Sequence, residues 1–312
     1  MKRVLTAAVL VLGVAGCDGA GFSSFSRGTS VSPASRAAPT APSATSVALA
    51  RYYESTQSRM LAQGLLRQDR GGADAQFSAG DLAENFERIA LFNEYTVRQG
   101  RFVAQQTPSR LRRWSNPVVI QTVFGPSVTE EQSQKDVASV ARYAQRLSRV
   151  SGHPIRVTGG ENANFHVLFL NSDELSSAGP LLQQLLPAIN GASITGITQM
   201  PRSTFCAVYA FSDRTNPNSH VAAIAVIKAE HPDLLRLSCI HEEIAQGLGL
   251  ANDSPAARPS IFNDDDEFAL LTQHDELLLS MLYDPRLRPG MTPEQARPTV
   301  SRIAREKLSG AS

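Results

Sequence analysis

Two hydrophobic periodicities alternate along the chain from about residue 111 onward. Short apolar runs bounded by turn-forming residues predict buried β-strands, whereas apolar positions three and four residues apart predict helices. The expected strands cover residues 113–125, 154–160, 163–171, 203–212 and 220–229, with a turn at 213–219. The expected helices cover residues 129–152, 173–186 with an interruption at 179–180, 233–250, and a segment from about 267 or 270 to 283. This order predicts an α/β (α+β) fold, in which a mixed, mainly parallel sheet is backed by helices.

The preceding segment has a weaker pattern. Its expected elements are a helix at 47–68, a short helix capped by Asp81 and running through Arg88, and a hairpin of residues 89–97 and 101–106. We expect residues 47–108 to form an N-terminal extension packed on a main domain of residues 109–312. Within that domain, residues 284–298 are expected to be extended and to lead into a short basic tail.

The N-terminus carries a targeting pattern. Lys2 and Arg3 precede an apolar run that is too short to span a membrane as a stable helix, which predicts a signal peptide over residues 1–16. The letters "VAGC" resemble the lipobox of bacterial lipoproteins, which implies cleavage before Cys17 and lipidation of its thiol. Plain secretion with an incidental Cys17 is the alternative. Residues 17–46 are rich in Ser, Ala, Pro, Thr and Gly, the composition of a disordered tether. We therefore expect a protein held on a bacterial membrane by lipid and facing the periplasm.

Composition and cysteine content narrow the classes of partner and bond. The formal charge is +1 and no basic stripe is interleaved with aromatic residues, so a nucleic-acid partner is not expected. The mature chain would keep Cys206 and Cys239, and an oxidising compartment favours a disulfide between them. Two buried free thiols are the alternative. Neither cysteine has a second thiol nearby, which disfavours a zinc role.

The most informative stretch is "CIHEEIAQGLGLANDS", residues 239–254. A helical zinc site needs a second ligand one turn after the first, but the position four residues after His241 is Ala245. His241 is therefore expected to be a packed or exposed histidine. Glu242 and Glu243 are adjacent, so their side chains should point about 100° apart on a helix and should not face one substrate atom together. Glu243 with Asp253, or with an acid of residues 264–267, is a possible acid–base pair.

Moving the frame by one residue produces a second pattern. Glu242, Glu243, Gln246, Gly249 and Asn252 have the spacing of His-Glu-x-x-His-x-x-Gly-x-x-His, the zinc motif of metzincin peptidases. The segment "SIFND" further on resembles the metzincin Ser-x-Met turn, with Phe262 where Met would lie. The resemblance implies a metzincin-like domain in which Glu242, Gln246 and Asn252 replace the three zinc-binding histidines, while the base position, Glu243, is kept.

Longer segments of the chain resemble one family. Residues 85–95, 111–114, 241–254 and 259–291 together are similar to bacterial lipoproteins of the domain-of-unknown-function family numbered 2927. This resemblance covers most of residues 50–295. It implies a relation to zincin-type peptidases, with the Glu-Glu-x-x-Gln helix at the centre of the motif, and it implies no particular activity.

The ligand chemistry decides between two functions. Amide oxygens are poor zinc ligands, and without zinc Glu243 has no polarised water to deprotonate. Zinc would need help from His274 or a nearby acid, so no cofactor and no metal are expected. The acidic run 264–267 is expected to be a solvated start of the next helix, with cation binding as the alternative. We expect a binding or assembly module whose cleft, formed by His241, Glu242, Gln246, Asn252 and Asp253, takes an envelope peptide, glycan or protein. The alternative is an envelope peptidase or other hydrolase that uses Glu243 as general base.

Overall fold

A computed structural model of the chain describes residues 9–13, 41–98, 101–160, 162–213 and 215–310. Its centre is a seven-stranded sheet in the order β1-β8-β9-β7-β5-β6, with β4 also pairing with β9. The strands are β1 (Val9–Gly13), β4 (Arg113–Trp114), β5 (Val118–Phe124), β6 (Ile155–Val157), β7 (Phe165–Leu170), β8 (Cys206–Ser212) and β9 (Ser219–Lys228). All pairings are parallel except β8 with β9. The predicted mixed, mainly parallel sheet backed by helices is confirmed.

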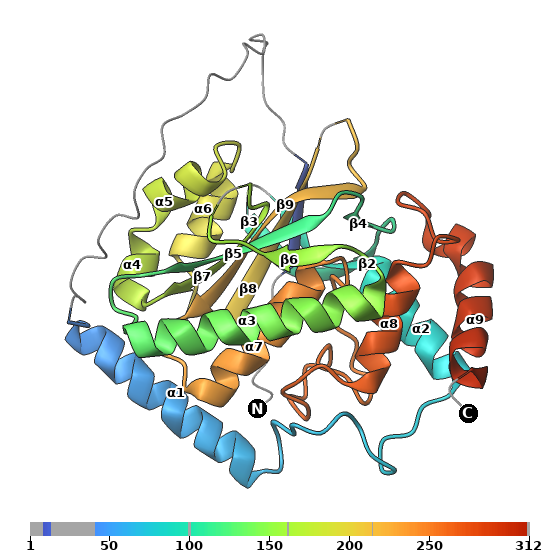
Figure 1. Ribbon diagram of the computed structural model, residues 1–312, viewed down its shortest axis with the longest axis horizontal. Helices are drawn as coiled ribbons and strands as arrows, with labels where there is room; N and C mark the ends of the chain where they lie inside the picture. The colour runs from blue at the N-terminus through green and yellow to red at the C-terminus, as the bar shows by residue number, and fades with distance from the viewer. Residues whose placement is uncertain (1–8, 14–40, 99–100, 161, 214, 311–312) are drawn as a thin grey trace.

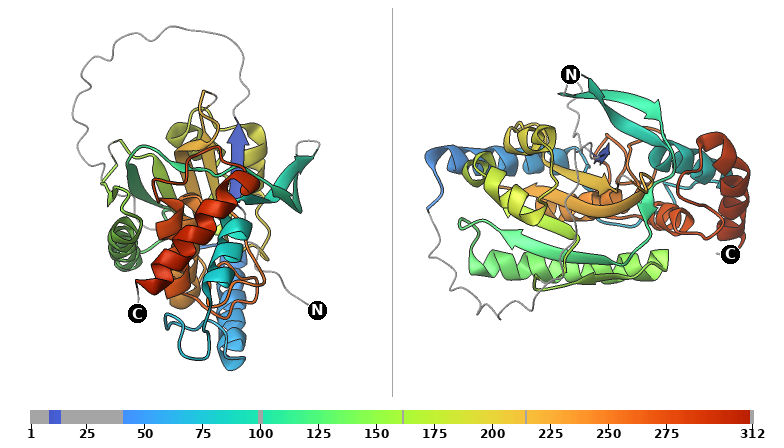
Figure 2. Two further views of the ribbon diagram at one scale, coloured as in Figure 1. Left: turned by 90° about the vertical axis from the view of Figure 1, so that its right-hand side faces the viewer. Right: turned by 90° about the horizontal axis from the view of Figure 1, so that it is seen from above.

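Helices cover both faces of the sheet, and the views in Figures 1 and 2 show the three layers. On one face, α3 (Glu130–Ser151) and α7 (Asp233–Gly247) pack on side chains such as Val167 and Val208. On the other face lie three short helices, α4 (Ser172–Ser176), α5 (Gly179–Leu185) and α6 (Gly191–Thr198). The strands alternate between these two cores, because Val167 and Val208 belong to the first and Leu168 and Ala207 to the second.

The remaining elements surround this sandwich. Helix α1 (Ala44–Ala62) lies along one end of the sheet. A separate hairpin of β2 (Phe92–Arg98) and β3 (Arg101–Pro108) projects from the body of the molecule (Figure 2). The helices α2 (Ala79–Ala90), α8 (Gln273–Leu282) and α9 (Pro293–Ser309) group at the opposite end from α1 (Figure 1). The described residues contain no helix that is both long enough and apolar enough to cross a membrane.

Several expected elements differ from the structure in their bounds. The helix α1 begins at Ala44, inside the expected tether, because Ser43 caps it by accepting from the backbone N–H of Ser46. Ser78, and not Asp81, is the N-cap of α2. Asp81 is the third residue after this cap and completes the capping box by accepting from the Ser78 backbone N–H. The expected strand 113–125 is divided into β4 and β5, since Pro117 cannot donate to a ladder. Cys17 and most of the expected signal peptide and tether lie outside the described residues.

Two helices were missed or misjudged. The prediction that residues 284–298 are extended is wrong for its second half, where α9 begins with Pro293 in its first turn and a capping box of Thr292 and Gln295. Helix α6 was not predicted, although Asn190 caps it. The interruption expected at residues 179–180 is the boundary between α4 and α5.

Candidate functional site

Helix α7 lies under β8 and β9 and is buried around most of its circumference from Cys239 onward. A disulfide between Cys206 and Cys239, with an S–S distance of 2.00 Å, joins the first residue of β8 to the middle of α7. This confirms the predicted disulfide and rules out the alternative of two free thiols. The helix ends at Gly247, and Gly249 follows with φ of +124°. A Cβ atom at Gly249 would lie 2.4 Å from the carbonyl oxygen of Arg112, so only glycine fits this turn.

The carboxyl groups of Glu242 and Glu243 come closer together than expected. One oxygen of each lies within 4.8 Å of the other and of the Cys206 sulfur. The expectation that the two side chains would diverge is therefore wrong, because long side chains can bend back together from neighbouring helical positions. Glu243 is fully buried, and Glu242 is 9% exposed. The Cys206 sulfur is already in the disulfide, so this group offers two carboxylates and no thiolate, fewer ligands than a zinc site requires.

Further acids approach Glu242 from the loops after α7. We call Glu242, Asp253, Asp264, Asp265 and Asp266 the acidic cluster. Burial raises the pKa of Glu242 well above its usual value, and repulsion from Asp253, Asp266 and Asp264 adds to the effect. Burial and the neighbouring Asp264 raise the pKa of Asp253 in the same direction. Burial, helped by Asp265 and Asp264, raises the pKa of Asp266 to about 8. Some of these carboxyl groups therefore hold a proton at neutral pH.

The structure brings Glu242, Gln246 and Asp253 together and directs the side chain of Asn252 elsewhere. Glu242 and Gln246 lie one turn apart on α7, and the Gln246 Nε2 group donates to Asp253 Oδ1 over 3.2 Å. The Asn252 Nδ2 group instead donates over 2.7 Å to the carbonyl oxygen of Arg88 in α2. The side-chain oxygens of Gln246 and Asn252 have no hydrogen-bond partner among the described residues. Asp253 is thus the loop residue that contacts the face of α7 on which Gln246 lies.

Both histidines considered for this region have structural contacts. His241 Nδ1 accepts from the backbone N–H of Leu271 over 3.0 Å, and the ring stacks on Tyr143 at 4.0 Å. Burial lowers the pKa of His241 to about 3, so the ring is neutral and serves as a packed residue. His274 shares a hydrogen bond of 3.2 Å with the buried amide of Asn85 on α2.

The turn at residues 260–264 is anchored by a residue that the sequence analysis missed. Asp275, in the first turn of α8, accepts from the Ser260 hydroxyl at 2.5 Å and from the Ile261 N–H at 3.1 Å. Phe262 is fully buried, and its carbonyl oxygen accepts from Ser254. A Thr-x-x-Asp capping box at Thr272 was the available signal for Asp275. The acidic run was expected to start the next helix; this is wrong, because α8 begins nine residues after Asp264.

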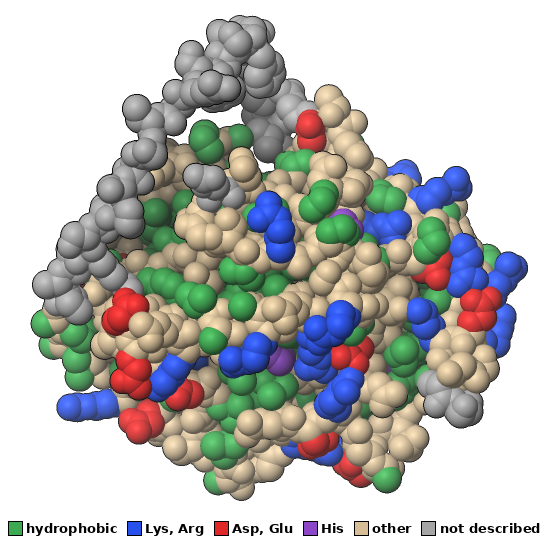
Figure 3. Space-filling view, viewed as in Figure 1, with side chains coloured by type: hydrophobic (Ala, Val, Ile, Leu, Met, Phe, Trp, Pro, Cys, Tyr) green, Lys and Arg blue, Asp and Glu red, His purple; other side chains and the backbone are tan. Residues whose placement is uncertain are grey.

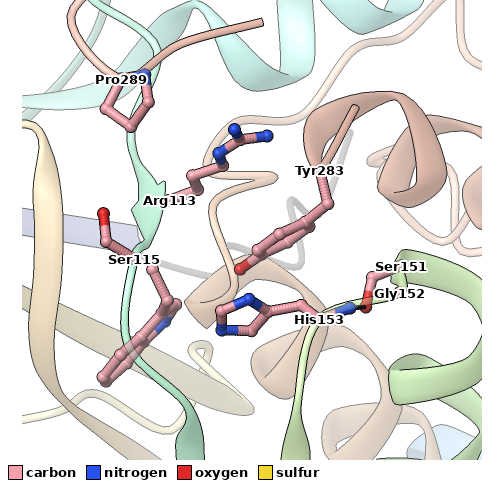
Figure 4. A pocket seen from close by; sticks show the side chains of 8 residues that line it. Arg113, Ser115, Ser151, Gly152, His153, Tyr283 and Pro289 are labelled. Atoms are coloured by element: carbon pink, nitrogen blue, oxygen red, sulfur yellow. Dashed lines mark hydrogen bonds between the residues drawn. The ribbon is translucent and has the colours of Figure 1, made fainter. Parts of the chain in front are cut away.

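Two cavities elsewhere in the molecule have different linings. One, of about 330 Å³, lies at the amino-terminal ends of β5 and β6, and Figure 4 shows Arg113, Tyr283 and His153 around it. Arg113 donates to the carbonyl oxygens of Leu282, Asp284 and Leu287. The Tyr283 hydroxyl is bonded to a carbonyl as well, so these groups hold the backbone together. The other cavity, of about 490 Å³, lies between α1 and the N-termini of α3 and α7. Neither is lined by the acidic cluster.

The charges on the surface are mixed. On the face drawn in Figure 3, basic and acidic side chains are interspersed among polar and apolar ones. The formal net charge of +1 agrees with this pattern. The acidic cluster is therefore a local concentration of one sign in a molecule that is otherwise balanced.

A family model described as "Protein of unknown function (DUF2927)" matches residues 79–302. The chain belongs to this family. The match includes α7, the acidic cluster and the turn at 260–264, and it leaves out α1 and the N-terminal segment. No curated protein and no solved structure matches the DUF2927 chain.

Proposed function

We propose that this DUF2927 protein is a lipid-anchored protein of the bacterial envelope that binds an extended peptide along the edge of β8. The observation that supports the proposal is the pairing of β1. Residues Val9 to Gly13 form a parallel ladder with Val208 to Ser212. These five residues lie in the expected signal peptide, residues 1–16. Cleavage before Cys17 would remove β1 and leave β8 at the edge of the sheet, where an incoming strand can pair with it.

The edge of β8 runs beside the polar face of α7. Cys206 opens β8, and the oxygens of Glu242 and Glu243 lie within 4.8 Å of its sulfur. A peptide paired with β8 in the register of β1 would begin next to these carboxyl groups. Backbone pairing favours a peptide over a glycan, because a glycan has no alternating N–H and C=O groups.

The proposal includes a metzincin-like origin for the domain. Its support is the antiparallel strand β8 beside α7, the glycine turn after that helix, and the buried turn at Phe262. Glu242 and Gln246 have the helical spacing of the first two metzincin ligands, whereas the Asn252 side chain turns toward α2, and a zinc peptidase is not proposed. One equivalent of tightly bound zinc in the purified protein would contradict this part of the proposal.

The binding proposal can be tested with the leader itself as probe. A labelled peptide of residues 2–15 should bind the chain that begins after residue 16 and should bind the chain that retains residues 1–16 at least tenfold more weakly. N-methylation of alternate peptide nitrogens removes ladder donors, so one alternating set should abolish binding and the other should not. Equal binding by both chains, or by both methylated peptides, would refute pairing along β8.

A hydrolase is the second candidate, because the carboxyl groups of Glu242 and Glu243 are close and burial raises the pKa of Glu242 well above its usual value. One group could then donate a proton while the other accepts one. The test is release of fragments from envelope peptides by the wild type, Glu243→Gln and the exposed control Glu84→Gln. Turnover that is lost only in Glu243→Gln would support a hydrolase, and no turnover by the wild type would exclude it for those substrates.

A further inference from the structure

The cavity of about 490 Å³ beside α1 lies at the carboxyl ends of three parallel strands. It is lined by the segments that leave these ends, namely residues 127–129 after β5, Asn171 after β7 and residues 229–232 after β9. The helix after β5 packs on one face of the sheet and the helix after β7 packs on the other, so the chain diverges here. Open α/β sheets bind ligands in the crevice at such a point. Helix α1 closes one side of this crevice, beside the start of α3 (Figure 1).

Three side chains at the cavity keep a polar atom without a partner. Glu230 Oε2, His231 Nδ1 and Arg236 Nε have no hydrogen-bond partner among the described residues. All three residues line the cavity, and their exposed fractions are only 7%, 3% and 5%. Buried polar atoms are costly when they are unpaired, so this group of three indicates that a ligand supplies their partners.

The other contacts of Glu230 and His231 hold both side chains in place. Glu230 Oε1 accepts from the Ser46 hydroxyl over 2.9 Å and from the Ser172 N–H over 2.7 Å. His231 Nε2 donates to the Phe205 carbonyl over 2.8 Å, and burial lowers the pKa of His231 to about 3. The imidazole is therefore neutral, and its Nδ1 atom is an acceptor. These two residues present two acceptors to a ligand.

Arg236 provides a donor in the same cavity. Its Nη1 group donates to Asp136, and its Nη2 group donates to backbone carbonyls just after β9, which leaves the Nε–H without an acceptor. The side chain arises at the start of α7. The N-cap of this helix is Pro232, whose side chain cannot accept from the N–H groups of the first turn. An uncapped helix start and a guanidinium N–H both favour a bound anionic group.

We propose that this cavity binds one small zwitterion with an apolar side chain, either an α-amino acid or a dipeptide. The ammonium group donates to Glu230 and His231, and the carboxylate accepts from Arg236 and the start of α7. A zwitterion fits better than a simple cation, which would meet Arg236, or a simple anion, which would meet Glu230. The site does not depend on the proposed peptide binding, because the residues that line this cavity do not belong to β1 or β8.

The rest of the cavity suits the apolar part of such a ligand. Val47, Ala50 and Val128 contribute to a mainly apolar lining. A volume of about 490 Å³ is far larger than one ordered water needs and lies in the range of sites for small organic molecules. Arg51 and Glu54 of α1 are exposed and also line the cavity, so a ligand can enter from this side.

The proposal can be tested on the full chain by calorimetric titration with L-leucine and with L-leucyl-L-leucine. At least one of these parent compounds should bind at one saturable site with a dissociation constant below about 1 mM, which ligands of this size can reach. The parent that binds more tightly identifies the length of the ligand. N-acetylation removes its ammonium group and amidation removes its carboxylate, so each blocked form should bind at least about tenfold more weakly. This comparison uses the wild type alone and does not depend on the folding of a variant.

A pair of variants tests the assigned residues. Glu230→Gln keeps an oxygen for Ser46 and Ser172 but loses the charge, so it should weaken binding at least about tenfold. The matched control Glu54→Gln removes the same charge from an exposed residue of the lining and should change the affinity less than about threefold. The proposal is overturned if neither parent compound binds saturably up to about 10 mM, if a blocked form binds as tightly as its parent, or if both variants weaken binding equally.

Discussion

Removal of the Cys206–Cys239 disulfide should destabilise the protein by about 4 kcal/mol. The bond links residues 33 positions apart, and it closes a loop that contains β8, β9 and the first half of α7. In the chain-entropy model, opening a loop of this length increases the conformational entropy of the unfolded state, which lowers its free energy by about 4 kcal/mol at 25 °C. Both cysteines are 2% exposed, so a Cys206→Ala, Cys239→Ala double variant also loses buried sulfur contacts.

Two comparisons separate the cross-link from the lost contacts. Urea unfolding can be followed by fluorescence of the single tryptophan, Trp114, which is buried and donates to the Gly247 carbonyl at the end of α7. Reduced wild type retains both sulfurs and should lose about 4 kcal/mol of unfolding free energy. The double variant should lose more and should not respond to reductant. A loss below about 1 kcal/mol on reduction of the wild type would refute the entropic reasoning.

Three further predictions concern single residues. Burial, with a smaller effect of Arg112, lowers the pKa of His220 to about 3, so the folded state resists a proton that the unfolded state binds below pH 6.5. His220 alone should cost about 1.4 kcal/mol of stability per pH unit as pH drops from 6.5 toward 3, and His220→Gln should change the slope of the stability–pH profile by that amount. Gly249→Ala should lower the unfolding free energy by more than about 3 kcal/mol in urea titrations, because the Cβ atom would meet the Arg112 carbonyl. Trp114→Phe should cost about 2 to 4 kcal/mol in thermal unfolding, because it leaves the buried Gly247 carbonyl without its donor.

Local signals in the sequence were sufficient wherever a cap and a periodic run agreed. Thr129 caps α3 and Gly152 ends it in the left-handed conformation, as the charges and the glycine predicted. The strands β8 and β9 and the turn between them were also predicted correctly, from two apolar runs and the polar residues that separate them. These elements are specified by residues that lie close together in the chain.

Predictions failed where contacts between distant residues decide the structure. The prolines at 293 and 298 suggested an extended segment, but apolar positions such as Val300 and Ile303 pack into the core and hold α9. Tertiary burial outweighs the weak propensity of such a segment. The pairing of β1 with β8 could not be read from the sequence, because an apolar run after two basic residues indicates a signal peptide equally well.

In the candidate site, too, the local relations were predicted correctly and the contacts between distant residues were not. Helical spacing correctly placed Glu242 and Gln246 on one face of α7, since that relation is local. The partner from beyond the helix is Asp253 and not Asn252, because the path of the chain after Gly249 turns Asn252 toward α2. The contribution of Asp264 and Asp266 depends on a loop whose course no periodicity describes.

The composition of α7 lowers the stability that its burial would otherwise provide. A helix buried on nearly all sides is most stable when its residues are apolar, yet Glu242, Glu243 and Gln246 are buried within two turns. Each such group destabilises the fold unless it is paired, and the disulfide at Cys239 supplies compensating stability one turn earlier in the helix. The loop that carries Asp253 also contacts β3, since the Gln106 side chain donates to the Asp253 carbonyl over 3.2 Å. This contact joins the loop after α7 to the hairpin of β2 and β3, whose strand β2 contacts β1 at the edge of β8.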